Sequence, residues 1–374
     1  MRVLLVEPPY KRKYPPLGLM KLSTWYKKKC HEVRYIRGEN WIDNYDDFTP
    51  DRIYITSLFT WDLPIVARTT RAFKNNFPEA EIKIGGVAAS AIPKYVEKET
   101  GIKPHVGILK DIDTCTPDYH LSKETKELKE SMVFTQRGCP HKCKYCVVRM
   151  IEPNYYELKG WEKAISDDKP KIVVFDNNIL KASKSHINHV FNVLNNTEKP
   201  FDINSGFDVF LFKKEHAEII AKSKIHPIRF AFDKMSQEKP LIKAVGLCKK
   251  AGINLETIRV YVLYNYTDDL KEARYRAEKV IKLGCKPFVM RYKPLDWLSK
   301  KLYVSPQWDR EQLVDFTYYY NMPVVWNIMS YEDFLKERNE GSFEKERKKK
   351  QISFNPNKKI DWDNWQKPNI NKSV

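Results

Sequence analysis

The 374-residue chain contains no long apolar stretch. None of its apolar runs approaches the roughly 18 consecutive apolar residues that a membrane-spanning helix requires. Its first residues, MRVLLVEPPY, turn polar too soon for a secretory signal and are typical of a first β-strand. We therefore expect no membrane association and a cytoplasmic location.

The sequence also lacks the cysteine pattern of a disulfide-bonded protein. Its seven cysteines are an odd number, and three of them fall within eight residues, whereas a disulfide framework uses an even number spread along the chain. This excludes a disulfide scaffold and favours a single metal site. The others are expected to be ordinary small apolar residues, and they are Cys30, Cys115, Cys248 and Cys285.

The chain has fewer acidic than basic residues. The chain has 66 Lys and Arg against 48 Asp and Glu, a formal net charge of +18. A basic surface attracts polyanions such as nucleic acid. However, the abundance of Lys, Asn, Ile and Tyr is also typical of AT-rich genomes, so nucleic-acid contact stays open. The 42% hydrophobic content excludes a disordered chain.

Residues 1–112 alternate strand-like and helix-like segments. Short apolar runs at 3–6, 33–36, 53–55 and 82–84 are separated by helical spacing at 17–29 and 65–73. This alternation predicts an α/β domain with a doubly wound, Rossmann-like parallel sheet, whose ligands would bind beyond the carboxyl ends of the strands. Residues 113–130 are polar and patternless, which predicts a linker.

Residues 131–292 contain six further β-runs with helical stretches between them. Six such units predict a partial (β/α)6 barrel whose strand ends face one site. The remaining residues, 293–374, form a C-terminal extension with aromatic residues and a basic tail. The six runs are 132–136, 172–176, 201–207, 228–233, 258–263 and 288–292.

A three-cysteine motif follows the first of these runs. In the segment TQRGCPHKCKYC, Cys139, Cys143 and Cys146 are spaced to wrap one compact loop around a metal cluster. Thiolates are the natural ligands of iron–sulfur clusters, and three of them leave one iron of a [4Fe–4S] cube open. A zinc site is the alternative, but zinc prefers four closed ligands, and His141 inside the loop fits poorly as the fourth.

The C-x₃-C-x₂-C spacing, with an aromatic residue before the last cysteine, resembles the signature of the radical S-adenosylmethionine superfamily. The resemblance covers residues 130–292. It implies that S-adenosylmethionine chelates the open iron, that an external flavodoxin-like or ferredoxin-like donor supplies one electron, and that the resulting adenosyl radical abstracts hydrogen from a substrate. The implied cofactor contacts are Tyr145, Asp176, Asn177, Asn204, Ser205, Arg229, Asp233 and Val262.

The N-terminal domain resembles the cobalamin-binding domains fused to many such enzymes. The resemblance rests on E-P-P, P-P-L-G-L-M, a Thr-Ser-Leu segment and a Gly-Gly pair, although the cobalt-ligating D-x-H-x-x-G loop is absent. Small residues let the backbone close around a nucleotide tail. The implied cobalamin contacts are Pro8, Pro9, Leu17, Gly18, Ser57, Leu58, Gly85 and Gly86.

Three functions remain open from the sequence. The first expectation is a cobalamin-dependent C-methyltransferase. The second is a cobalamin-independent radical modification, such as rearrangement, cyclisation or dehydrogenation, of a nucleic acid, nucleotide or peptide. The third is a non-catalytic, basic nucleic-acid-binding protein with a structural metal site.

Overall fold

The computed structural model describes residues 1–11, 15–38 and 48–340. The chain divides into two compact units, Met1–Asn321 and Met322–Val374. The predicted basic tail lies outside the described residues, and the described part of the second unit contains α12 (Pro323–Trp326) and α13 (Tyr331–Asn339). No helix among the described residues is long and apolar enough to cross a membrane.

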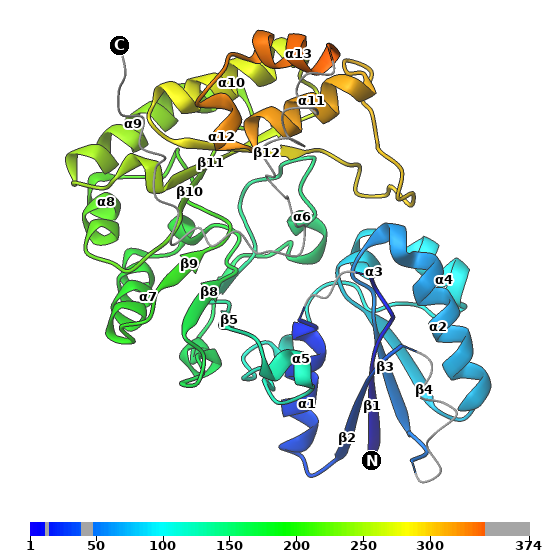
Figure 1. The fold of residues 1–374 in the computed structure, drawn as a ribbon. Helices are drawn as coiled ribbons and strands as arrows, with labels where there is room; N and C mark the ends of the chain where they lie inside the picture. Colours follow the sequence, from blue (N-terminus) through cyan, green and yellow to red (C-terminus); the bar gives the residue numbers. More distant parts are fainter. Residues whose placement is uncertain (12–14, 39–47, 341–374) are drawn as a thin grey trace, which may run out of the picture. The chain divides into compact units, whose positions relative to one another are not determined.

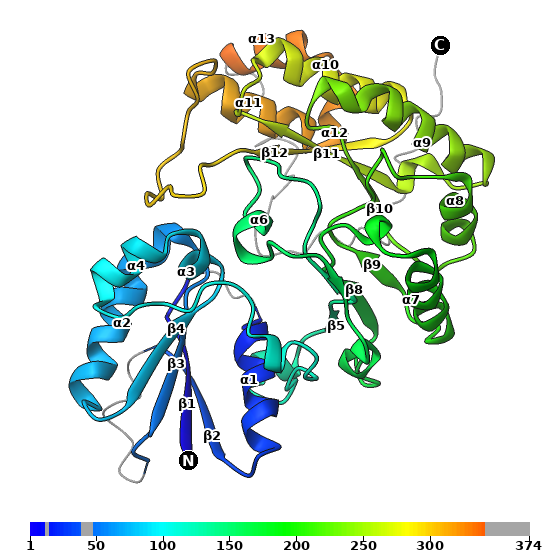
Figure 2. The ribbon, with the colours of Figure 1, turned by 180° about the vertical axis from the view of Figure 1, so that it is seen from behind.

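The first sheet has four parallel strands in the order β2-β1-β3-β4. Figures 1 and 2 show α1 (Leu17–Lys27) on one face of this sheet and α2 (Leu63–Asn76) on the other. Alternate residues of β1 serve the two faces, because Val3 and Leu5 pack with the α1 side, whereas Leu4 and Val6 pack with the α2 side. The strands are β1 (Arg2–Glu7), β2 (Glu32–Arg37), β3 (Arg52–Thr56) and β4 (Glu81–Gly85).

The segment expected to be a linker, residues 113–130, packs against the rest of its unit. Asp113 and Tyr119 are each at most 5% exposed, and the Tyr119 hydroxyl accepts a hydrogen bond from the Met132 backbone. The polar composition of this segment gave no indication that these two side chains are buried. The short helices in and before this segment are α3 (Val87–Ala91), α4 (Pro93–Thr100) and α5 (Lys123–Lys126).

All six predicted β-runs after residue 130 are strands, and they form two three-stranded parallel sheets, β5-β8-β9 and β10-β11-β12. A mixed α/β class with parallel sheets is therefore confirmed. The strands are β5 (Glu130–Val133), β8 (Lys171–Val174), β9 (Phe201–Ile203), β10 (Ile228–Ala231), β11 (Ile258–Tyr264) and β12 (Lys286–Arg291).

Helices cover one side of these strands (Figures 1 and 2). A short antiparallel pair, β6 (Gln136–Arg137) with β7 (Tyr156–Glu157), lies beside the cysteine motif. The covering helices are α7 (Lys184–Asn196), α8 (Lys214–Ala221), α9 (Glu238–Lys250), α10 (Leu270–Lys282) and α11 (Arg310–Tyr320), whereas the short helix α6 (Val148–Ile151) follows the cysteine motif and contacts α3.

β11 shows which side chains can face a ligand. Along this strand buried and partly exposed residues alternate. Val260 and Val262 are fully buried, whereas Tyr261 and Leu263 lie on the opposite, more open face. A ligand on the open side would therefore meet Tyr261 and Leu263.

Arg276 ties α10 to the ends of two strands. Its side chain is fully buried. Its Nη1 donates to the carbonyl oxygens of Phe232, at 3.0 Å, and Leu263, at 2.7 Å, and its Nη2 pairs with Asp268. One guanidinium therefore fixes the loops that follow β10 and β11.

Replacement of Arg276 by Met should lower the free energy of unfolding by about 3–5 kcal/mol, because it leaves a buried carboxylate and two carbonyls without their donor. Urea unfolding would measure the change. The control is Lys271→Met, an exposed residue on the same helix. Equal losses in both variants would contradict this role for Arg276.

Candidate metal and cofactor site

The cysteine loop begins at Gly138, directly after β6. Gly138 has φ +78°, and a Cβ there would lie 2.3 Å from the Asn154 carbonyl oxygen. Only glycine allows this approach. The loop is thereby pressed against residues 154–155, and all three cysteines are partly buried.

A buried ion network holds the start of this loop. Arg137 Nε donates to Asp113 Oδ2 at 3.0 Å, and Arg137 Nη1 to Glu152 Oε1 at 2.9 Å. Lys21, from α1, pairs with the same Asp113 at 3.3 Å. The four side chains are each at most 9% exposed. Two cations and two anions balance, which is what makes their burial tolerable.

The network changes the proton affinity of its members. Burial alone would raise the pKa of Asp113, but the hydrogen bonds and charge of Arg137 hold that pKa below its ordinary value. Burial and the nearby Arg137 charge lower the pKa of Lys21. Glu152 also accepts from the Gly138 backbone nitrogen at 2.7 Å, so the network extends to the residue before Cys139.

In the segment after β8, the two residues predicted to contact the cofactor make hydrogen bonds within the protein. Asp176, predicted to contact the cofactor, is fully buried and accepts from the backbone nitrogens of Thr135, at 2.6 Å, and Gln136, at 3.2 Å. Asn177, also predicted, donates to Glu152 at 2.6 Å. In this arrangement both side chains brace the start of the cysteine loop, and Asp176 has no exposed oxygen for a ligand.

Asn178 directly follows the two predicted residues of this segment. It is 4% exposed, and its Nδ2 lies 3.9 Å from Cys139 Sγ and 2.9 Å from Asp208 Oδ2. Its Oδ1 is buried without a hydrogen-bond partner in the structure. Asp208 also pairs with His141 of the loop. A buried acceptor of this kind beside the cysteines suits a ligand that brings a hydrogen-bond donor.

Tyr145 and Asp233 were predicted separately, and the structure brings them together. The Tyr145 hydroxyl donates to Asp233 Oδ2 at 3.2 Å, and Asp233 Oδ1 accepts from the Leu263 backbone at 2.9 Å. The Tyr145 ring meets Tyr266 edge to face at 5.5 Å. The cysteine loop is thus joined to the carboxyl ends of β10 and β11.

The other predicted contacts divide into two groups. Asn204 is exposed, and Ser205 donates to the Asp176 carbonyl, so both lie at the end of β9 near the loop. Arg229 is buried and bound to Asp202. The side chain of Val262 is fully buried, and the neighbouring Tyr261 and Leu263 lie on the more open face of β11.

In the first sheet, the predicted Ser57 and Gly-Gly elements meet. Ser57 donates its backbone N–H to the Gly85 oxygen at 2.7 Å, and a Cβ on Gly86, which has φ +117°, would lie 2.5 Å from the Ser57 oxygen. The glycines therefore allow two loops to approach closely. Ser57 itself is fully buried.

Tyr10 occupies the gap between the ends of β1 and β3, where the strand order reverses. Its ring is 3% exposed. Its hydroxyl donates to the Thr56 carbonyl at 2.7 Å and accepts from the Leu58 backbone nitrogen at 3.2 Å. This switch point is where doubly wound sheets bind ligands, so Tyr10 fills the position that the cobalamin expectation requires.

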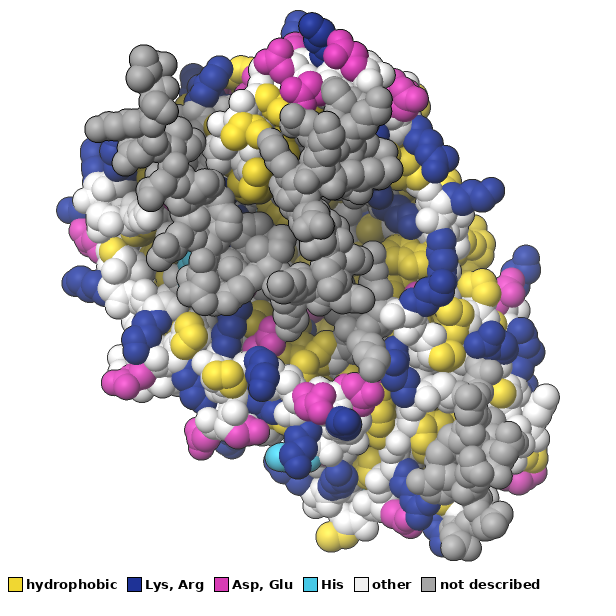
Figure 3. All heavy atoms as spheres, in the orientation of Figure 1, with side chains coloured by type: hydrophobic (Ala, Val, Ile, Leu, Met, Phe, Trp, Pro, Cys, Tyr) yellow, Lys and Arg dark blue, Asp and Glu magenta, His cyan; other side chains and the backbone are white. Residues whose placement is uncertain are grey.

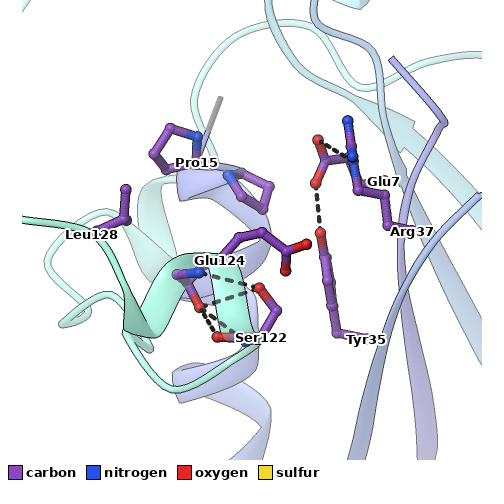
Figure 4. A pocket seen from close by; sticks show the side chains of 9 residues that line it. Glu7, Pro15, Tyr35, Arg37, Ser122, Glu124 and Leu128 are labelled. Atoms are coloured by element: carbon purple, nitrogen blue, oxygen red, sulfur yellow. Dashed lines mark hydrogen bonds and ion pairs between the residues drawn. The ribbon is translucent and has the colours of Figure 1, made fainter. Parts of the chain in front are cut away.

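A cavity of about 140 Å³ lies near the predicted residues at the end of β1 (Figure 4). It is lined by Pro15, Pro16 and Arg37, and by Glu7, whose carboxylate is held by the Tyr35 hydroxyl. Burial raises the pKa of Glu7. The cavity is smaller than the 300–1,000 Å³ usual for drug-sized ligands. Of the predicted set, Pro8 is buried, Pro9 and Leu17 are partly buried and Gly18 is exposed.

The described residues contain no group of three His, Cys, Asp or Glu side chains arranged around a single metal ion. A cube is a different case, because its thiolates bind separate irons and stand apart from one another. The loop carries three thiols, which are the donor type of an iron–sulfur cluster.

No protein-family model matches the chain, and no curated protein shows significant similarity to its sequence. Its function is therefore inferred from these residues and their geometry.

Gly138→Ala should lower the free energy of unfolding by more than about 2 kcal/mol, because it adds a backbone clash to an unfavourable φ. The matched control is Gly160→Ala, since Gly160 has φ +70° but its nearest neighbour would lie 4.0 Å away. Urea midpoints of the two variants give the comparison. Similar midpoints would show that the close approach to residue 154 is unimportant.

Asp176 should make stability depend on pH. Burial, opposed by hydrogen bonds from Thr135 and Gln136, raises its pKa from 3.8 to about 6. The folded state then binds the proton more tightly than the unfolded state, so this contribution is full below about pH 4 and is lost as the pH rises to about 6, a change of about 3 kcal/mol. Unfolding free energies of the wild type and Asp176→Asn between about pH 4 and pH 7 test this. Parallel curves would contradict it.

Proposed function

We propose that the chain is a radical S-adenosylmethionine enzyme that modifies its substrate without cobalamin. The observation that carries the proposal is the cysteine loop with Asn178 beside it. Three partly buried thiols follow a strand end, and a buried amide next to Cys139 leaves its oxygen without a partner.

Cys139, Cys143 and Cys146 would hold the cluster. Their loop is anchored at both ends, at Gly138 through Glu152 and at Tyr145 through Asp233. The order of the parallel strands from β5 to β12 supports a partial barrel around this loop. Hydrogen bonds between the β9 and β10 regions, such as that from Phe207 nitrogen to Arg229 oxygen at 2.8 Å, link its two halves.

In this proposal, four side chains would hold S-adenosylmethionine. The Asn178 Oδ1 would accept from its ammonium group, since this buried acceptor beside Cys139 has no other partner. The Tyr145 ring, Tyr261 and Leu263 would contact its adenine from the loop and from the open face of β11. The chemistry supplied by the bound cluster and cofactor is one-electron cleavage and removal of a hydrogen atom from a substrate carbon.

We infer that the first sheet does not hold cobalamin, and three observations support this inference. Tyr10 closes the switch point, Ser57 is wholly buried, and the nearby cavity measures about 140 Å³. The methyl-transfer reaction that the sequence favoured is therefore not proposed. A cobalamin-independent radical modification is the function that the residues support best.

Anaerobic reconstitution with iron and sulfide, followed by electron paramagnetic resonance of the reduced protein, tests the proposal. We expect a [4Fe–4S] signal that S-adenosylmethionine alters, and release of methionine and 5′-deoxyadenosine with a reductant such as dithionite. Cys143→Ala should lose the cluster, and Cys30→Ala, at an exposed cysteine, should retain it. A signal unaffected by S-adenosylmethionine would instead indicate a structural metal site.

Asn178→Ala should weaken the effect of S-adenosylmethionine on that signal by about tenfold in concentration, because a hydrogen bond to a charged group contributes about 1.5–3 kcal/mol. The control is Asn188→Ala, an exposed residue on α7. If both variants respond like the wild type, Asn178 does not contact the cofactor.

A further inference from the structure

An aromatic row runs outward from the cysteine loop. Ring centroids are separated by 5.5 Å from Tyr145 to Tyr266, 4.6 Å from Tyr266 to Tyr292, and 5.9 Å from Tyr292 to Tyr303. Trp297 continues the row, 5.2 Å from Tyr303. Every ring is partly exposed. We call Tyr266, Tyr292, Trp297 and Tyr303 the aromatic wall.

Three of the four wall residues, Tyr292, Trp297 and Tyr303, belong to a segment that is held in place. Residues 292–303 follow β12 without regular structure, but three contacts join them to residues 60–62. Thr60 Oγ1 donates to the Trp297 carbonyl at 2.8 Å, and Lys300 pairs with Asp62 at 2.8 Å. Lys293 lies 4.0 Å over the Trp61 ring. Because the segment is already ordered, a ligand that binds to it loses little free energy to the ordering of this loop.

The charge around the wall has predominantly one sign. Residues 140–150 and 291–303 expose six Lys and Arg side chains and one acidic side chain, Asp296. Figure 3 shows Lys and Arg side chains interspersed with hydrophobic ones over the region where Figure 1 draws the segment between β12 and α11. We call the six basic residues the basic rim: Lys142, Lys144, Arg149, Arg291, Lys300 and Lys301.

We propose that the wall and rim bind single-stranded nucleic acid as the substrate of the reaction proposed above, on which this inference rests. Aromatic faces stack with bases of any sequence, and cations track the phosphates. A duplex would keep its bases paired and unavailable for stacking. An acidic peptide would satisfy the rim but would leave the aromatic wall without partners. The wall reaches Tyr145, so a base at its inner end lies beside the cysteine loop.

Fluorescence anisotropy of the full chain with a 5′-fluorescein-labelled single-stranded RNA of mixed sequence tests the proposal. The same RNA as a duplex and a fluorescein-labelled polyglutamate are the competing probes. We expect the single strand to bind at least tenfold more tightly than either. Equal binding of polyglutamate would show that charge alone is recognised, and no binding of the single strand would overturn the proposal.

Variants separate stacking from charge. Trp297→Ala should weaken single-strand binding by about tenfold, since stacking on one aromatic side chain contributes about 1–3 kcal/mol. The control is Trp25→Ala, because Trp25 is also a partly exposed tryptophan but lies on α1. Equal effects in both variants would refute the stacking role.

Arg291→Gln with Lys301→Gln should make the slope of log affinity against log salt shallower by about 0.7 for each phosphate that the variant no longer neutralises. Lys239→Gln with Lys243→Gln, two exposed residues of α9, makes the same charge change and should leave the slope unaltered. Equal slopes in the two double variants would refute the rim. These measurements need no cofactor cleavage, so they can fail while the resonance and product assays succeed, and the reverse also holds.

Discussion

The buried ion network centred on Arg137 is the constraint on which the candidate site depends. Its guanidinium binds Asp113 on one side and Glu152 on the other. Glu152 in turn binds the Gly138 nitrogen and Asn177. Removal of Arg137 would leave Glu152 buried without its counterion, and removal of Asp113 would do the same to Lys21. The network therefore fixes the residue that precedes Cys139, and through Asn177 it also fixes the end of β8.

Around this network, the side chains at the strand ends differ in whether they keep a hydrogen-bond acceptor free for a ligand. Asp176 uses its oxygens on the backbone of Thr135 and Gln136, whereas Asn178, two residues later, keeps one buried oxygen unpaired. Asp233 binds Tyr145 and the Leu263 backbone. In the proposed function, the cofactor position is marked by the polar atom that the described residues leave unpaired, because a buried acceptor without a donor is costly unless a ligand completes it.

These details show what sequence patterns could and could not predict. The strands were predictable because alternation and apolar runs are local properties. The cysteine loop was predictable because its three cysteines lie within eight residues. The choice of Asn178 over Asp176, and of Tyr261 over Val262, depends on which way a strand faces and on partners far away in the chain. Arg229 illustrates the limit, since its partner Asp202, on β9, lies 27 residues away in the chain.

The first sheet acquires a structural explanation once Tyr10 is seen to close its ligand position. Lys21 on α1 contributes a charge to the Arg137 network, and Thr60 and Asp62, after β3, bind the segment that carries Trp297. The sheet thus supports both the cysteine loop and the aromatic wall. Because small displacements of positioned groups weaken catalysis strongly, these two contacts give the first sheet a role in holding the geometry of the proposed site, whether or not it binds a ligand itself.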